Sequence, residues 1–214
     1  MLTLKNPNGL AKAVVALLAG NIFFDVLLGL FEARWLTADA MPYTFDPAQF
    51  GPVDLNPAYS LSALVFLATV VVFVVWFHRL RHNAEVWAAD LQGRKPGWAI
   101  GGWFVPIGNL WIPRAIAADI WRASRWQPYA ADGARELTLL NAWWTVWIAD
   151  WIVGRVAAQL YKGAETPEAW DRAAAWSLAS YAVNVVAAVL AILFVRRLTS
   201  MQHHKATGMI PAAQ

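Results

Sequence analysis

The sequence contains no cysteine, and this absence excludes several kinds of site at once. Without a thiol, the chain cannot form disulfides, thiolate zinc sites, iron–sulfur clusters or a cysteine nucleophile. Charged residues are also scarce, at 14% of 214 residues, whereas soluble domains normally carry about 25%. A low charge content is expected of a surface that faces lipid, because a charged side chain is costly there.

Motifs of soluble enzymes are missing as well. No glycine-rich phosphate loop precedes a helix, no nucleophile elbow is present, and Ser, His and Asp do not follow a triad-like order. Soluble-type nucleotide chemistry is therefore disfavoured, and a non-catalytic role is favoured over an enzyme. The net charge of +3 does not indicate nucleic acid as a partner, because in a membrane protein such charge usually fixes orientation.

Four apolar segments are long enough to cross the hydrocarbon core of a bilayer, which takes about 20 helical residues. They cover residues 11–31, 58–77, 137–160 and 173–195. Between the first two, residues 32–57 contain four prolines, which forbid a regular helix and predict a loop. The predicted fold class is an all-α integral membrane protein with four transmembrane helices in a single domain, residues 1–214.

The positions of Lys and Arg predict the orientation, because cytoplasmic loops carry the excess of these residues. The loop 32–57 and the short loop after Tyr161 are poor in cations, so both are expected outside. The N-terminal segment, residues 78–136 and the C-terminal tail 196–214 hold most of the cations. We therefore expect an N-in, C-in multi-pass protein.

A signal peptide is the other interpretation of the first apolar segment, since Ala38-Asp39-Ala40 resembles a small-residue cleavage site. However, the segment is longer than a signal core and contains Asn21 and Asp25, which signal peptides normally avoid. A transmembrane helix is therefore the favoured prediction.

The central segment between Lys95 and Arg114 has no charged residue, but glycines and prolines interrupt it repeatedly. It is too short and too broken for an ordinary span. Irregular backbone is tolerated at membrane depth only under protein cover. We therefore expect a re-entrant or interfacial element on the cytoplasmic side, between the second and third spans.

An amphipathic helix is predicted directly after this element. Pro113 suits the first turn of a helix, and residues 114–126 place three arginines on one side and apolar residues on the other. Such a helix lies either along the inner leaflet, where its cations bind anionic head groups, or on the protein's own helices.

The same part of the chain resembles a known family. The residues that carry the resemblance are the run from Pro96 to Trp111 (PGWAIGGWFVPIGNLW), Pro113, Trp121-Arg122-Ala123-Ser124 and, before them, Arg81-His82-Asn83-Ala84. The pattern is similar to that of the domain of unknown function 4328 family, a group of bacterial membrane proteins common in actinobacteria. The resemblance implies a helical protein of this layout in a bacterial plasma membrane, and no activity. The signature residues are Trp98, Gly101, Gly102, Trp103, Pro106, Asn109, Trp111, Pro113, Trp121 and Arg122.

Polar side chains inside the predicted spans form a second candidate group, because such residues are costly in a bilayer. Asp25 and Arg155 are at matching depth in two helices that run in the same direction, so we predict that they pair. The group either holds the helices together or forms a polar pocket for a small ligand or ion. Its members are Asn21, Asp25, Asp150, Arg155 and Asn184.

The sequence is rich in tryptophan, with fourteen residues. Trp143, Trp147 and Trp151 recur at intervals of four in the third span, and Trp144 lies beside the first. Such a stripe predicts packing between helices rather than a ligand platform.

Histidines after the second span are a third candidate group. If the helix continues past this span, His78, His82 and Glu85 lie on one face, and two imidazoles with a carboxylate suit zinc or iron. Interfacial histidines among arginines are the simpler interpretation. We therefore predict no cofactor, with a metal or haem at His78 and His82 as the alternative.

Taken together, these observations predict a non-catalytic scaffold or accessory component of the membrane. Its cytoplasmic element is expected to bind anionic lipid head groups or a protein partner, including a second copy of the chain. The alternative is a protein that handles a small ligand or ion, or that uses a histidine-bound metal.

Overall fold

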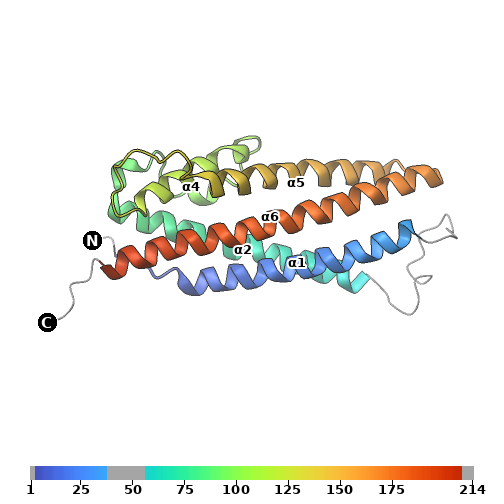
Figure 1. Cartoon of the computed structure of the whole chain (residues 1–214), viewed down its shortest axis with the longest axis horizontal. Helices are drawn as coiled ribbons and strands as arrows, with labels where there is room; N and C mark the ends of the chain where they lie inside the picture. Colours follow the sequence, from blue (N-terminus) through green and yellow to red (C-terminus); the bar gives the residue numbers. More distant parts are fainter. Residues whose placement is uncertain (1–2, 38–55, 209–214) are drawn as a thin grey trace. The chain divides into compact units, whose positions relative to one another are not determined.

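The structure is a computed structural model, and it describes residues 3–37 and 56–208. All regular structure in these residues is helical (Figure 1). The long helices are α1 Asn8–Leu36, α2 Asn56–Trp87, α5 Thr138–Lys162 and α6 Pro167–Gly208. Between α2 and α5 lie η2 Ala89–Leu91, α3 Trp98–Gly101, η3 Gly108–Leu110 and α4 Ile112–Ala123. The predicted all-α class is confirmed for this part of the chain.

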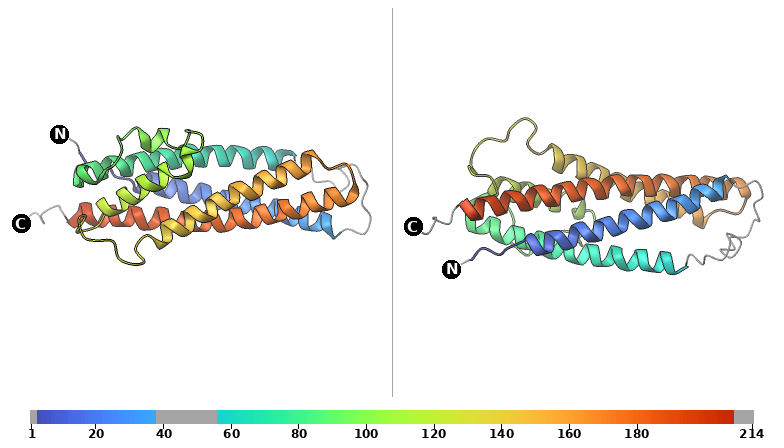
Figure 2. Two further views of the ribbon diagram at one scale, coloured as in Figure 1. Left: turned by 90° about the horizontal axis from the view of Figure 1, so that it is seen from above. Right: turned by 60° about the horizontal axis from the view of Figure 1, so that its bottom comes forward.

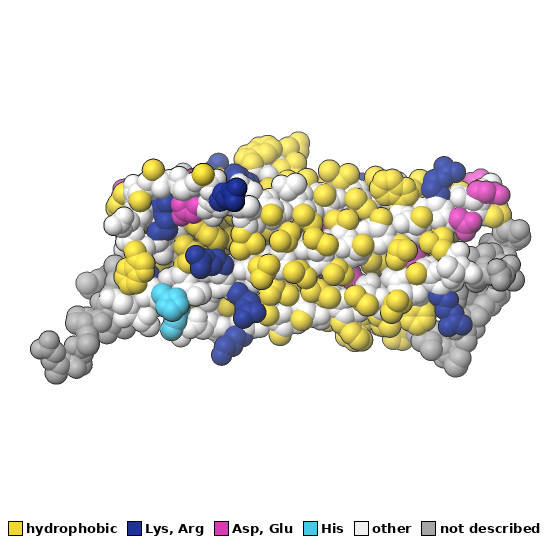
Figure 3. Space-filling model, in the orientation of Figure 1, with side chains coloured by type: hydrophobic (Ala, Val, Ile, Leu, Met, Phe, Trp, Pro, Cys, Tyr) yellow, Lys and Arg dark blue, Asp and Glu magenta, His cyan; other side chains and the backbone are white. Residues whose placement is uncertain are grey.

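Among the described residues, three helices are long and apolar enough to cross a membrane, namely α1, α2 and α6. The stretch predicted as the third span does form a helix, α5. This helix is less apolar because it carries Asn141, Asp150 and Arg155. Three candidate spans are therefore established where four were predicted. On the face seen in Figure 3, hydrophobic side chains dominate the middle part of the long helices, and charged side chains lie toward their ends.

The helices extend beyond the predicted spans. α2 continues to Trp87, and α6 continues to Gly208, so the predicted tail 196–214 is helical up to that residue. Both helices continue because no Gly or Pro follows their apolar runs before Gly93 in the case of α2 and Gly208 in the case of α6. The predicted outer loop 32–57 overlaps the ends of α1 and α2, and its residues 38–55 lie outside the described residues.

The described residues group into two compact units, and each long helix contributes to both. Unit 1 comprises residues 3–17, 68–144 and 190–208, and unit 2 comprises residues 18–37, 56–67 and 145–189. The single membrane domain expected from the sequence stays a prediction.

A buried polar network joins α2, α4 and α6 in unit 1. Gln202 is 1% exposed, and its Oε1 accepts a hydrogen bond of 2.9 Å from Asn83. Its Nε2 donates to the carbonyl of Leu80 at 3.1 Å and to the hydroxyl of Ser124 at 3.2 Å. Asn83 in turn accepts from the backbone N–H of Lys5 and donates to its carbonyl, both at 2.8 Å. Because both polar atoms of Gln202 are satisfied, the network favours one arrangement of these helices.

Aromatic rings fill the core of unit 1. Phe194 stacks against Trp143 and Trp121, with centroid distances of 4.8 and 6.2 Å. Trp76 meets Phe194 edge-on at 6.1 Å, and its Nε1 donates to the hydroxyl of Thr199 at 3.0 Å. The buried indole N–H therefore has a polar partner inside an otherwise apolar cluster.

The predicted tryptophan stripe packs at one end only. Trp143 and Trp144 are each 4% exposed, whereas Trp151 is 58% exposed. The spacing of four predicts that these residues lie along one stripe of a helix. It does not determine how much of that stripe is covered by neighbouring helices.

Lys205 attaches α6 to the C-terminal end of α4. Its side chain is buried, and its Nζ donates to the carbonyls of Ala123 at 2.8 Å and Arg125 at 2.7 Å. The Nζ atom also lies 5.1 Å from the ring centroid of Trp87. A cation at a helix C-terminus satisfies carbonyls that have no partner within the helix and interacts favourably with the helix dipole.

Polar and aromatic contacts of Tyr161 join helices in unit 2. The hydroxyl of Tyr161 donates to the carboxylate of Glu32. The ring of Tyr161 meets Trp170 edge-on, with a centroid distance of 5.7 Å. These contacts connect α1, α5 and α6.

We expect Lys205→Met to destabilise the protein, because the variant leaves two carbonyls at the end of α4 without their donor. A buried polar group that loses its partner costs about 1–3 kcal/mol. Thermal unfolding in mild detergent, followed by circular dichroism, should show a clearly lower midpoint. Arg196→Met is the matched control, since Arg196 is exposed on the same helix. Equal midpoints for the two variants would contradict the capping role.

Candidate functional site

The signature segment, residues 96–111, folds into short turns against α2 and α5 (Figure 2). The ring of Trp103 meets Phe73 and Phe77 of α2 edge-on, with centroid distances of 5.5 and 5.8 Å. The Nε1 of Trp144 in α5 donates to the carbonyl of Leu110 at 2.9 Å. The segment is thus fixed to both helices within unit 1.

Among the exposed large apolar side chains of this segment, three are more than half exposed. Phe104 is 68% exposed, Ile107 69% and Trp111 53%. Ile107 has a φ of 62°, a conformation that is rare for a β-branched residue and costs about 1–3 kcal/mol. We call these three residues the apolar tip. Neighbouring exposed apolar residues of this size are typical of a surface that meets a protein or a membrane.

The remaining signature residues divide into packing and surface positions. Gly102 is needed for packing, because an added Cβ would lie 2.7 Å from the Ile112 side chain and 2.8 Å from the Trp98 carbonyl oxygen. Gly101 has open space instead. The buried signature residues are Gly102, Pro113 and Trp121, the half-buried ones are Gly101, Trp103, Asn109 and Arg122, and Trp98 and Pro106 are exposed.

The predicted amphipathic helix forms α4, with Pro113 in its first turn. Its apolar residues Ile116, Ile120 and Trp121 are buried within unit 1. Of the two placements that the sequence left open, the structure therefore shows the apolar face on the protein's own helices.

Two arginines at the end of α4 are paired with carboxylates of the loop that follows. Arg122 lies 2.8 Å from Asp132 and 3.4 Å from Asp119. Arg125 lies 2.9 Å from Glu136 and 3.4 Å from Asp132. In the structure, acids ten and eleven residues further along the chain therefore pair with Arg122 and Arg125. The expectation that the cations of this helix bind head groups stays a prediction.

These ion pairs fix the loop 124–137, which stands away from the helices in Figure 2. The guanidinium of Arg125 also donates to the carbonyls of Pro128 and Ala130, at 2.8 and 2.9 Å. The hydrogen bond from Arg122 holds the pKa of Asp132 below its ordinary value of 3.8. A depressed pKa means that the ionised form stabilises the loop above pH 3.8 and that this contribution is lost as the pH falls through the lower, folded-state value.

The carboxyl group of Asp119 behaves in the opposite way. Burial raises its pKa above 3.8, against the hydrogen bond that it accepts from the backbone N–H of Gly93. Its ionised form is therefore less favourable in the folded protein than in the unfolded chain. Asp119 consequently adds little to the loop, which depends on Asp132 and Glu136.

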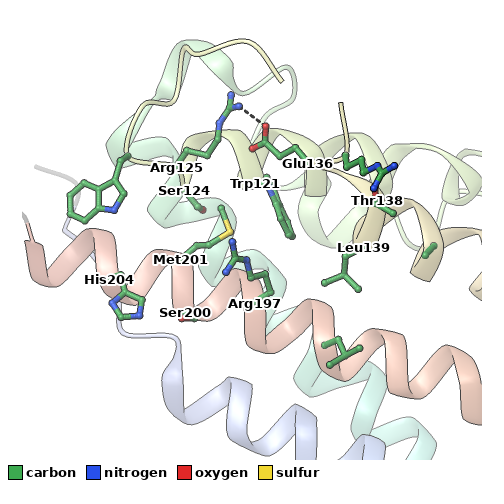
Figure 4. Close-up of a pocket in the computed structure, with 14 residues that line it drawn as sticks. Trp121, Ser124, Arg125, Glu136, Thr138, Leu139, Arg197, Ser200, Met201 and His204 are labelled. Carbon is green, nitrogen blue, oxygen red and sulfur yellow. Dashed lines mark hydrogen bonds and ion pairs between the residues drawn. The ribbon is translucent and has the colours of Figure 1, made fainter. Parts of the chain in front are cut away.

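A cleft of about 1140 Å³ opens in unit 1 beside this loop (Figure 4). Its walls come from the end of α4, the loop, the start of α5 and the last part of α6. Arg135 and Arg197 line it, and both are exposed. In the sequence, these arginines count only among the cations that predict the orientation in the membrane. Their positions at the ends of two apolar segments were the signal that could have identified them.

The polar residues of the predicted spans are partly brought together in unit 2. Asn184 of α6 donates to Oδ1 of Asp25 in α1 at 3.3 Å, and Asp150 of α5 is close enough for its charge to act on Asp25. Asn21 lies on α1, one turn before Asp25.

The predicted ion pair between Asp25 and Arg155 is wrong. Asp25 is buried and Arg155 is exposed, and no ion pair joins them among the residues that the structure describes. Residue counting gave the depth of each side chain along its helix, but it did not determine the direction in which each one points.

His78, His82 and Glu85 do not converge on a metal site. Glu85 pairs with Arg81, and the Nε2 of His82 is 3.0 Å from the carbonyl oxygen of Thr3. Within the described ranges, no group of three or more His, Asp and Glu residues is placed to hold a metal ion. A metal or haem at His78 and His82 stays a prediction.

The fold and the long apolar helices define a class: a helical protein with the features of a membrane protein. The model of one family, described as a domain of unknown function (DUF4328), matches residues 55–200. This match covers more than half of the chain, so the chain belongs to that family, and the resemblance noted in the sequence is confirmed. No curated protein and no solved structure matches the chain.

We expect Arg125→Gln to loosen the loop, because the variant removes its pairs with Glu136 and Asp132. Hydrogen exchange at pH 7 should be about tenfold faster for the amides of residues 127–136, which corresponds to about 1.4 kcal/mol. Lowering the pH of the unmodified protein to 5 should leave the loop protected, since the lowered pKa of Asp132 keeps its carboxylate ionised there. Arg114→Gln is the control, because Arg114 donates to Asn141 rather than to a carboxylate. Unchanged exchange in Arg125→Gln would show that the ion pairs do not hold the loop.

Proposed function

We propose that the protein is a multi-pass protein of a bacterial plasma membrane with four spans, α1, α2, α5 and α6. In this proposal it is a non-catalytic scaffold or accessory component, and its apolar tip enters the cytoplasmic leaflet. The observation that carries the proposal is the exposure of Phe104, Ile107 and Trp111. The segment that holds them is fixed to α2 near the end of its apolar part and to α5 near the beginning of its apolar part.

The contacts inside unit 1 support α5 as the fourth span. Asn83 at the end of α2 bonds to Gln202 at the end of α6, so these two points are on the same side of the membrane. If α6 crosses once, the chain between them must cross one more time, and α5 is the helix available. Its 25 residues extend about 37 Å, which exceeds a hydrocarbon core of about 30 Å.

The same contacts support an N-in, C-in arrangement. Lys5 is hydrogen-bonded to Asn83, so the N-terminal segment lies on the same side as the ends of α2 and α6. This side also carries Arg79, Arg81 and the arginines of α4, which is the distribution expected for cytoplasm.

The depth of the signature segment supports contact with lipid. Trp103 packs on Phe73, which lies inside the apolar part of α2. Leu110 bonds to Trp144, which is seven residues, or about 10 Å, beyond the start of the apolar part of α5 at Leu137. Interfacial elements bury their apolar residues by about 5–10 Å. The exposed side chain of Ile107 is also less costly in the apolar interface than in water.

Anionic lipid is the favoured contact, because Lys95 and Arg114 flank the segment. Each such cation contributes about 1 kcal/mol near an anionic surface. A protein partner that covers the apolar tip, including a second copy of the chain, is the alternative.

One observation favours a second candidate, the handling of a small ion in unit 2. The Oδ2 atom of Asp25 is buried and lacks a hydrogen-bond partner among the described residues. Its other oxygen accepts from Asn184, and Asp150 acts on it by charge. A proton or a monovalent cation would offset this repulsion, as ionisable groups in transport proteins do.

We expect nitroxide labels at the apolar tip to report lipid. The chain has no cysteine, so Phe104→Cys and Ile107→Cys can each be labelled selectively in protein reconstituted with anionic lipid. Electron paramagnetic resonance should show high accessibility to oxygen and low accessibility to a water-soluble nickel chelate. Gly133→Cys, in the exposed loop, should show the reverse.

High nickel accessibility at both positions 104 and 107 would contradict the proposed contact with the membrane. Low accessibility to both reagents would indicate protein cover instead of lipid, and would favour the partner alternative.

A further inference from the structure

The cleft in unit 1 has an excess of positive charge. Arg125, Arg135 and Arg197 line it, and the carboxylate among its lining residues is Glu136, which is already paired with Arg125. Glu136 also accepts a hydrogen bond from the backbone N–H of Gly133, at 3.1 Å. Among the described residues, no carboxylate lies within 4 Å of the guanidinium nitrogens of Arg135 or Arg197. Both cations therefore keep their capacity to bind an anion.

Polar and apolar groups follow opposite orders in sequence on the two walls of the cleft. On α6, Leu193 comes one turn before Arg197, and Ser200 follows. On the other wall, Arg135 and Thr138 come first, and Leu139 and Ala142 follow in α5. Because α5 and α6 run in opposite directions (Figure 1), the arginines and hydroxyl groups share one level of the cleft, and the apolar residues share another. Figure 4 shows Arg197 and Ser200 on α6, and Thr138 and Leu139 on the opposite side of the cleft.

The outer wall of the cleft is held in place. The loop 124–137 is fixed by Arg122 and Arg125, as described above, and the Lys205 cap fixes the end of α4 from which the loop departs. Trp126 packs closely on Gly208 at the end of α6, where an added Cβ would lie 2.3 Å from its ring. A binding site with walls already in position loses less free energy to ordering when a ligand enters.

We propose that this cleft binds one anionic phospholipid, with the phosphate at Arg135 and Arg197 and an acyl chain along Leu139 and Leu193. Guanidinium groups bind phosphate oxygens with paired hydrogen bonds, and the hydroxyls of Thr138 and Ser200 supply further donors. Arg197 follows the apolar part of α6 by two residues, and Arg135 precedes that of α5 by two. Both therefore lie at head-group level if the helices span as proposed above.

The experiment is native mass spectrometry of the full-length protein, delipidated in mild detergent and titrated with dioleoyl phosphatidylglycerol. The unmodified protein should take up one lipid in preference to any further ones. Arg135→Gln combined with Arg197→Gln should raise the apparent Kd at least tenfold, since two charge-assisted contacts to phosphate are removed. Arg196→Gln is the matched control, because Arg196 is the exposed neighbour of Arg197 and does not line the cleft.

Two further ligands distinguish an anionic phospholipid from other compounds that carry a phosphate group. Dioleoyl phosphatidylcholine should bind at least several-fold more weakly, because its choline group is a cation that meets the arginines. Glycerol 3-phosphate, which has no acyl chain, should not compete at equal concentration. Competition by glycerol 3-phosphate as strong as that by phosphatidylglycerol would overturn the proposal in favour of a soluble phosphate compound.

Other results would also overturn the proposal. One is equal phosphatidylglycerol binding by the unmodified protein and the double variant, and another is an equal loss in Arg196→Gln, which indicates diffuse surface charge. Arg135→Gln alone, at an exposed loop position, provides a folded variant if the double variant does not fold, and it should raise the Kd about threefold. The spin-label result at positions 104 and 107 is a separate measurement, so the proposal for the apolar tip and the proposal for the cleft can be refuted independently.

Discussion

The hydrogen bonds of Gln202 are the constraint on which unit 1 depends. Its side chain is 1% exposed, so its donors and acceptor must be satisfied by protein, and each unmet one costs about 1–3 kcal/mol. The three partners come from two elements: Asn83 and Leu80 lie in α2, and Ser124 directly follows α4. An arrangement in which one of these elements moves by a helical turn loses at least one bond, so the network selects a single packing.

Both candidate sites follow from that packing. The position of α4 is fixed by Ser124 and by the Lys205 cap. The chain must therefore lead from α2 back to α4 through the short, irregular signature segment, and the apolar tip lies in the turns of that segment. The chain after it must cross from α4 to α5, and the paired arginines at the end of α4 fix that loop. The tip and the cleft are therefore consequences of where α4 is fixed.

Sequence reasoning predicted what depends on composition and periodicity. The long helices, the irregular segment after Lys95 and the start of α4 at Pro113 all follow from apolar runs, glycine and proline. It did not predict contacts between residues distant in sequence. Asp25 was expected to bind Arg155 but meets Asn184, because depth along a helix does not determine direction. The pairing of Arg122 with Asp132 was missed because an irregular loop has no period to reveal it.

A double-mutant cycle on Asn83 and Gln202 tests the central constraint most directly. Asn83→Leu, Gln202→Leu and the combination would be compared by reversible unfolding in mixed detergent micelles. If the buried network selects the packing, each single variant leaves a buried partner unsatisfied, and the double variant loses at least about 1 kcal/mol less than the sum of the singles. Losses that add to within about 0.5 kcal/mol would contradict this account, because they would mean that the two side chains stabilise the fold independently.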